Sequence, residues 1–125
     1  MLIQFSVSNF LSFDDKETFS MMAGKARKNI ERIFNNKKIK LTKCEVILGA
    51  NASGKSNLVS AFQFVQRMIV DGLPRGFSNK YFRMDSEKKS IPSDFEIEFL
   101  CDSKIFVYGF SLILSTSSIL KENLY

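Results

Sequence analysis

The chain has 125 residues, a length that suits one small domain, and 45% of them are hydrophobic, which is enough to build a core. Its formal net charge is +5, and the absence of histidine excludes histidine-based acid–base catalysis and histidine metal ligands within this chain. No apolar run approaches the roughly 18 residues that indicate a transmembrane helix, so no membrane partner is expected.

The first 22 residues are predicted to form two strands. Ile3, Phe5 and Val7 alternate with polar residues, which is typical of a strand with one solvated face. Residues Asn9 to Asp15 are then expected to turn the chain, and Thr18 to Met22 to return as a second strand.

The segment from Lys25 to Lys43 carries most of the positive charge. It contains eight basic residues and one acid, Glu31, so its net charge is +7 and the remainder of the chain totals −2. The basic residues are Lys25, Arg27, Lys28, Arg32, Lys37, Lys38, Lys40 and Lys43.

Two interpretations of this basic segment stay open. We favour a solvated connection between strands with Asn35-Asn36 as its turn, and the alternative is a contact with the phosphates of nucleic acid or another polyanion. Phe34 is the only aromatic residue among these charges, so base stacking is not indicated.

A short apolar run follows. Cys44, Val46, Ile47 and Leu48 predict a buried parallel strand. The other cysteine, Cys101, also falls in a strand-like run, and the two cysteines show no metal-ligand spacing. Both are therefore predicted to be buried free thiols, which fits a reducing, cytoplasmic location.

Residues Gly49 to Ser56 match the phosphate-binding pattern G-x-x-x-x-G-K-[ST] at every fixed position. Such a loop surrounds nucleotide phosphates with backbone N–H groups and places their charge at a helix N-terminus. Lys55 is expected to reach the β- and γ-phosphates, and the Ser56 hydroxyl to ligate Mg²⁺. The alternative is a glycine-rich turn with an exposed lysine. The strand-like run before the loop and the helix-like run after it favour a nucleotide site.

The residues after the loop have helical periodicity. From Leu58 onward, apolar residues recur at i, i+4, i+7 and i+11. The prediction is a helix from Ser56 to about Val70, the longest of the chain. Gly72 followed by Pro74 supplies the stop signal.

The last part of the chain predicts an antiparallel meander, after a polar and irregular connection from Leu73 to Ser93. Phe95, Ile97 and Phe99 alternate with acidic residues, so Glu96 and Glu98 are expected to face solvent. The chain is then predicted to turn at Asp102-Ser103, to form a strand over Ile105–Leu114, to turn over Ser115–Ser118 and to form a strand over Ile119–Tyr125. Thirteen phenylalanines and no tryptophan predict a phenylalanine-rich core.

Two motifs together carry a family resemblance. The turn Asn9-Phe10-Leu11-Ser12-Phe13, followed by the loop and helix start from Gly49 to Leu58, resembles the beginning of an ABC-type ATPase head of the SMC/RecF/OLD group. In particular, the chain is similar to bacterial AAA-family ATP-binding proteins often found in phage-defence systems. The resemblance implies an α/β P-loop NTPase fold, ABC-ATPase-head-like, with a strand–P-loop–helix unit and a mainly antiparallel β layer. Residues 1–125 would then be a single domain, the N-terminal portion of such a head.

The resemblance also implies roles for particular residues. The nucleotide site would consist of Gly49, Asn51, Ala52, Ser53, Gly54, Lys55, Ser56 and Asn57. Asn57 would contact the α-phosphate region, and the turn Phe10–Phe13 would lie near the base and ribose. Many members have a basic residue in that turn where this chain has Leu11, so that contact with ATP is not carried over.

Several parts of a complete ATPase head are not found in this sequence. These are the apolar strand that ends in an acidic pair, the serine-glycine signature loop and the switch histidine. No catalytic residue is therefore assigned, and the chain is expected to bind Mg-ATP but to hydrolyse it negligibly alone. The partner implied is the C-terminal half of the head or a second head in a dimer.

Two other function classes remain open. A GTPase or small kinase would also contain a P-loop, but Asn79-Lys80-Tyr81 is followed by Phe82 rather than the aspartate of the guanine-binding N-K-x-D pattern. A non-enzymatic interaction module with a vestigial loop would have no physical need for an intact Lys55 and Ser56.

Overall fold

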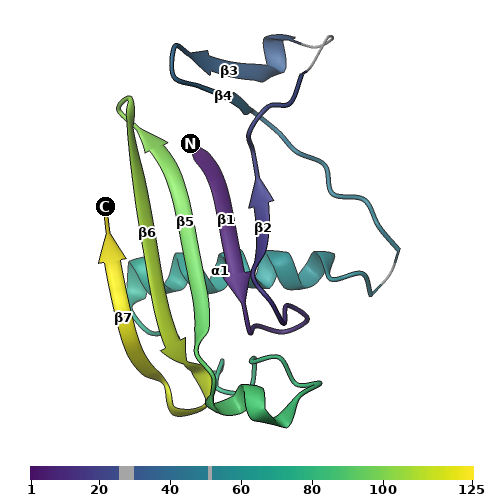
Figure 1. Cartoon of the computed structure of the whole chain (residues 1–125), viewed down its shortest axis with the longest axis vertical. Coiled ribbons are helices and arrows are strands. Elements are labelled where there is room, and N and C mark those ends of the chain that lie inside the picture. Colours follow the sequence, from purple (N-terminus) through teal and green to yellow (C-terminus); the bar gives the residue numbers. More distant parts are fainter. Residues whose placement is uncertain (26–29, 51) are drawn as a thin grey trace.

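The computed structural model describes residues 1–25, 30–50 and 52–125. A five-stranded antiparallel sheet in the order β2-β1-β5-β6-β7 carries one long helix, α1 (Lys55–Asp71), across one face (Figure 1). The sheet strands are β1 (Leu2–Ser8), β2 (Glu17–Ser20), β5 (Ser93–Cys101), β6 (Lys104–Ile113) and β7 (Ser118–Leu124). A separate hairpin consists of β3 (Ile33–Asn36) and β4 (Ile39–Thr42), and the short 3-10 turns are η1 (Ile30–Arg32), η2 (Ser86–Ser90) and η3 (Leu114–Thr116). The predicted mixed α/β fold with an antiparallel sheet is confirmed.

Strand β1 lies between β2 and β5, and its register places the apolar residues of three strands on one face. Phe5 faces Phe19 of β2 and Ile97 of β5. Residues directly opposite each other in an antiparallel pair point to the same face of the sheet. The alternation read from the sequence therefore places Phe5, Phe19 and Ile97 on one apolar face. The register shifts once between β1 and β5, at Leu2/Gln4, and once between β6 and β7, at Ser111/Leu112.

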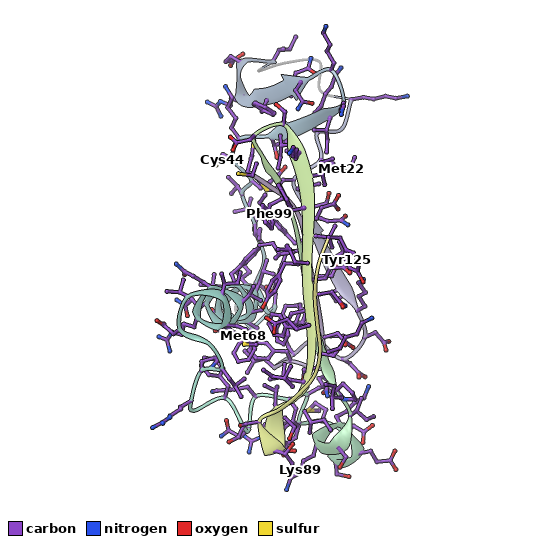
Figure 2. The ribbon with its side chains drawn as sticks, turned by 90° about the vertical axis from the view of Figure 1, so that its left-hand side faces the viewer. Met22, Cys44, Met68, Lys89, Phe99 and Tyr125 are labelled. Carbon is purple, nitrogen blue, oxygen red and sulfur yellow. The ribbon has the colours of Figure 1, made fainter. Side chains whose placement is uncertain are left out.

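Phenylalanine rings fill the space between α1 and that apolar face. Phe64 of α1 is fully buried, and its ring centroid lies 4.9 Å from that of Phe95 and 5.6 Å from that of Phe10. The helix also buries Ala61, Val65 and Met68, and Figure 2 shows Met68 between the helix and the sheet. The predicted helix and the predicted phenylalanine-rich core are both confirmed.

The opposite face of the sheet carries the polar residues of β1 and the acidic residues of β5, and no α-helix covers it in the described part of the chain (Figure 2). Lys16 and Glu96 form an ion pair on this face, and Ser8 donates a hydrogen bond to Asp94. Ser6 also belongs to it but is buried, and its hydroxyl shares a 2.9 Å hydrogen bond with Thr18 of the neighbouring strand. The predicted solvated face is confirmed apart from this one residue.

The hairpin β3–β4 rests on one end of the sheet. Leu41 is fully buried against Ile3 and Leu100, and Phe34 and Ile39 pack around this small cluster. The turn is at Lys37-Lys38, where the Asn36 side chain accepts hydrogen bonds from the Lys38 and Ile39 N–H groups. The prediction of a turn at Asn35-Asn36 was therefore two residues off at its centre, since both asparagines belong to β3. Arg27 and Lys28 of the predicted basic segment lie outside the described residues.

The strand predicted before the P-loop is absent. Residues 44–50 adopt no regular secondary structure, and Val46 and Leu48 are 74% and 88% exposed. No backbone–backbone hydrogen bond joins residues 44–49 to another described residue. A strand needs a neighbouring strand to accept and donate its backbone hydrogen bonds, and this segment has no such neighbour among the residues that the structure describes.

The prediction of buried thiols was also wrong. Cys44 and Cys101 are free and both are exposed, because Cys44 lies in the unpaired segment and Cys101 at the open end of β5. As to membranes, none of the helices in the described ranges has the length and apolar character needed for a span.

Candidate nucleotide-binding site

The P-loop lies at the N-terminal end of α1, and Lys55 closes it. The Lys55 ammonium donates hydrogen bonds to the carbonyl oxygens of Gly49 and Ala50, at 2.5 and 2.6 Å, and to the Ser53 hydroxyl at 3.0 Å. The lysine thus joins both ends of its own loop. The same three donor hydrogens are available to phosphate oxygens placed in the loop.

Two glycines make this loop geometry accessible. Gly54 has a φ of 91°, in the left-handed region that favours glycine, and a Cβ added there would lie 3.2 Å from the Ser12 hydroxyl oxygen. A Cβ on Gly49 would lie 2.7 Å from the hydroxyl oxygen of Ser53. Larger residues at either position would therefore have to move the side chains that shape the loop.

The N-terminus of α1 is open toward the loop. No side chain caps it, and its first turn contains no acidic residue. The N–H groups of Asn57 and Leu58 both bond to the Gly54 carbonyl, which leaves those of Lys55 and Ser56 without a helical acceptor. Unpaired N–H groups and the helix dipole create a positive potential at this end, which suits a phosphate group.

The turn Phe10–Phe13 lies beside the loop, although it is far away in sequence. Asn57 donates a 2.8 Å hydrogen bond from its side chain to the Ser12 hydroxyl oxygen. The turn is itself fixed by Asn9, whose buried side chain donates to the carbonyl oxygens of Lys88 and Ile91 and accepts from the Phe82 N–H group. The position of Ser12 at the P-loop therefore depends on a network that includes the irregular connection after α1.

A cavity of about 750 Å³ lies between the loop, this turn and strand β2. Its lining includes five P-loop residues, namely Gly49, Ala52, Ser53, Gly54 and Lys55. Three carboxylates that the sequence analysis did not single out also line it: Asp14, Asp15 and Glu17. The sequence signal that could have identified them is the group of acidic residues directly after the Asn9–Phe13 turn. Of these carboxylates, Asp14 forms an ion pair with Lys88, and this hydrogen bond raises the pKa of Lys88.

The acids considered at the sequence level lie elsewhere. Glu96 is paired with Lys16 on the open face of the sheet, as expected of a solvent-facing residue. Asp85 caps η2 by accepting a hydrogen bond from the Glu87 N–H group, and Asp102 lies in the turn after β5. None of the three lines the P-loop cavity.

The predicted site residues are brought together as a loop with a helix N-terminus. Gly49, Ala52, Ser53, Gly54, Lys55, Ser56 and Asn57 all lie in or directly beside it, and Asn51 lies outside the described residues. Residues Ala52 to Asn57 enclose a smaller hollow of about 270 Å³. The Ser56 side chain is exposed, as a hydroxyl must be to meet a metal ion bound to a nucleotide.

Comparison with known proteins agrees with this geometry. The family described as "AAA domain, putative AbiEii toxin, Type IV TA system" matches residues 46–125, which include the P-loop, α1 and strands β5 to β7. No curated protein matches the chain. The match covers more than half of the chain and supports an AAA-type, ATP-binding domain. The chain belongs to this family of AAA domains.

Proposed function

We propose that the chain binds Mg-ATP through Gly49–Asn57, as the Walker A portion of an SMC/RecF/OLD-like, ABC-type ATPase head. One observation carries the proposal: Lys55, the open N-terminus of α1 and the Ser12 turn converge on one loop. Each supplies a donor or a positive potential, and none of the three has a carboxylate as its hydrogen-bond partner. A polyphosphate is the ligand that this combination recognises.

Binding would exchange internal contacts for ligand contacts. Lys55 would release the Gly49 and Ala50 carbonyls and reach the β- and γ-phosphates, while the N–H groups of Lys55 and Ser56 would bind phosphate oxygens. The exposed Ser56 hydroxyl would hold Mg²⁺ together with phosphate oxygens and water, which is the oxygen-rich environment that this ion prefers. The ion would neutralise charge on the phosphates.

The cavity beside the loop suits the remainder of the nucleotide. Its volume of about 750 Å³ is within the range of small-molecule sites, and Ser12, Phe13 and Phe19 are among the residues that line it. We place the ribose and base in this cavity, because it continues from the phosphate loop toward the Phe10–Phe13 turn.

A partner would complete the site and the sheet. Val46, Ile47 and Leu48 are apolar and exposed, they pair with no strand among the described residues, and they directly precede the P-loop. We propose that they form a strand when the other half of an ATPase head, or a second head, supplies a neighbouring strand. Hydrolysis by the chain alone would be negligible, since the strand ending in an acidic pair and the signature loop of a complete head are not found in its sequence. A role in DNA maintenance or phage defence follows from the family resemblance.

Titration calorimetry with ATP and GTP, each with Mg²⁺, tests the nucleotide assignment. ATP should bind more tightly than GTP, and removal of Mg²⁺ with a chelator should weaken ATP binding. The Lys55→Ala variant should bind ATP at least about tenfold more weakly, because it lacks the charge aimed at the phosphates. Lys89→Ala is the matched control, since Lys89 is exposed at the opposite end of the molecule from the hairpin (Figure 2) and does not line the P-loop cavity.

Four results would contradict parts of the proposal. Equal ATP affinity of the Lys55→Ala variant and the Lys89→Ala control would show that the loop is not the site. Preference for GTP would indicate a GTPase instead. No nucleotide binding by the folded wild-type chain would favour an interaction module. Turnover near 1 s⁻¹ by the chain alone, roughly the lower end for typical enzymes, would overturn the expectation of negligible hydrolysis.

A further inference from the structure

The hairpin β3–β4 contains a cluster of basic residues that is not part of the nucleotide site. Residues 30–43 contain five basic residues and one acid, Glu31, and the five basic residues are all exposed. They are Arg32, Lys37, Lys38, Lys40 and Lys43. The hairpin lies at one end of the sheet, beyond the turn that joins β5 and β6, whereas the P-loop lies at the N-terminal end of α1 (Figure 1). The two features are therefore separate surfaces.

No carboxylate neutralises these cations within the part of the chain that the structure describes. The ion pairs found there are Lys16–Glu96 and Lys88–Asp14, both away from the hairpin. Lys43 instead donates a 2.9 Å hydrogen bond to the backbone carbonyl of Glu31, and the Glu45 carboxylate accepts a hydrogen bond from the Thr42 hydroxyl. The positive potential of the hairpin is therefore available to attract an external anion.

The hairpin is held rigidly enough to present this charge at a defined place. Its apolar side, which includes Leu41, is buried against the sheet. Backbone hydrogen bonds also join it to the chain after β2, from the Ala23 N–H group to the Lys40 carbonyl and from the Thr42 N–H group to the Met21 carbonyl. The charged side chains consequently project from an anchored element.

The shape of this surface favours a phosphate backbone as the ligand. The cavities at the P-loop and on the open face of the sheet include no residue of the hairpin, so its exposed basic residues lie on a surface outside these cavities. Phe34 is packed on the small cluster with Leu41 and does not offer a ring for base stacking. Such a surface suits contacts with phosphates and not with bases or peptide side chains.

From these observations we propose that the β3–β4 hairpin binds the phosphate backbone of double-stranded DNA without sequence specificity. Lys37 and Lys38 at the turn and Lys40 on β4 are its central contacts, and Arg32 and Lys43 flank them. The proposal does not rest on nucleotide binding, because the hairpin and the P-loop share no residue.

Fluorescence anisotropy of two labelled DNA duplexes of unrelated sequence, measured over a series of salt concentrations, tests the proposal on the full chain. Wild type should bind both duplexes equally. The K37S/K38S/K40S variant should lose at least about tenfold in affinity, and the slope of log K against log salt should fall by about 2 to 3 as up to three phosphate contacts disappear. The matched control is R75S/R83S/K89S, which removes three exposed cations from the connection between α1 and β5.

The control variant separates a local effect of the hairpin from an effect of overall charge. The R75S/R83S/K89S variant should keep wild-type DNA affinity, and circular dichroism should show that every variant is folded. Equal losses in the hairpin and control variants would show that only overall charge matters, and would overturn the proposal. It would also be overturned if wild type bound neither duplex, or if a poly-glutamate peptide bound through the hairpin lysines while DNA did not.

Discussion

Two apolar runs of this chain have similar composition and opposite structures. In β1, Ile3, Phe5 and Val7 are almost completely buried, with strands on both sides. Ahead of the P-loop, Val46 and Leu48 are mostly exposed and form no strand. The difference shows that apolar, strand-favouring residues become a strand only where neighbours complete the backbone hydrogen bonds and cover the side chains.

The comparison also separates stability from function. The β1 run supports the core between sheet and helix, whereas the run before the P-loop leads into the residues that we assign to phosphate binding. Changes in the first region should therefore act on folding, and changes in the second on ligand binding. Three measurements can test this division, in order of decreasing effect.

Amide hydrogen exchange should show the largest difference. Amides of β1 and β5 should exchange at least about 10³-fold more slowly than those of Ile47 and Leu48, because the former open only with the sheet. Nuclear magnetic resonance of the full chain at low concentration measures both groups in one sample. Strong protection of Ile47 and Leu48 under these conditions would show that the segment is already paired in solution, contrary to the structure.

The same substitution in each run should affect stability unequally. Ile3→Ala should lower the free energy of unfolding by about 2 to 5 kcal/mol, because it leaves a cavity against Leu41 and Leu100. Ile47→Ala should lower it by less than about 1 kcal/mol, since this side chain is 46% exposed. Urea denaturation followed by circular dichroism measures both values, and similar losses would contradict the comparison.

A glycine within the P-loop should matter for binding as well as for folding. Gly54→Ala should destabilise the chain by about 1 to 2 kcal/mol, because alanine is strained at a φ of 91°. It should also weaken ATP binding, since the added Cβ would press on the Ser12 hydroxyl that contacts Asn57. Gly24→Ala is the matched control, because nothing lies within 4 Å of a Cβ added there. Wild-type ATP affinity in Gly54→Ala would show that the Ser12 contact does not shape the site.

The local pattern of the sequence determined much of this protein. Alternation of apolar and polar residues predicted β1 and the β5–β7 meander, and helical periodicity placed α1 within one residue of its observed bounds. The G-x-x-x-x-G-K-[ST] spacing located the candidate site. These features could be predicted because each depends on residues that are close together in the chain.

The tertiary structure decided what depends on distant segments. Cys44 and Leu48 are exposed because no described strand lies beside them, which no local pattern reveals. Likewise, Ser12 contacts Asn57, and Asp14 lines the P-loop cavity, only because β1 and α1 pack together. Strand pairing and cavity lining are relations between segments far apart in sequence, so their outcome is fixed by packing and not by the residues of either segment alone.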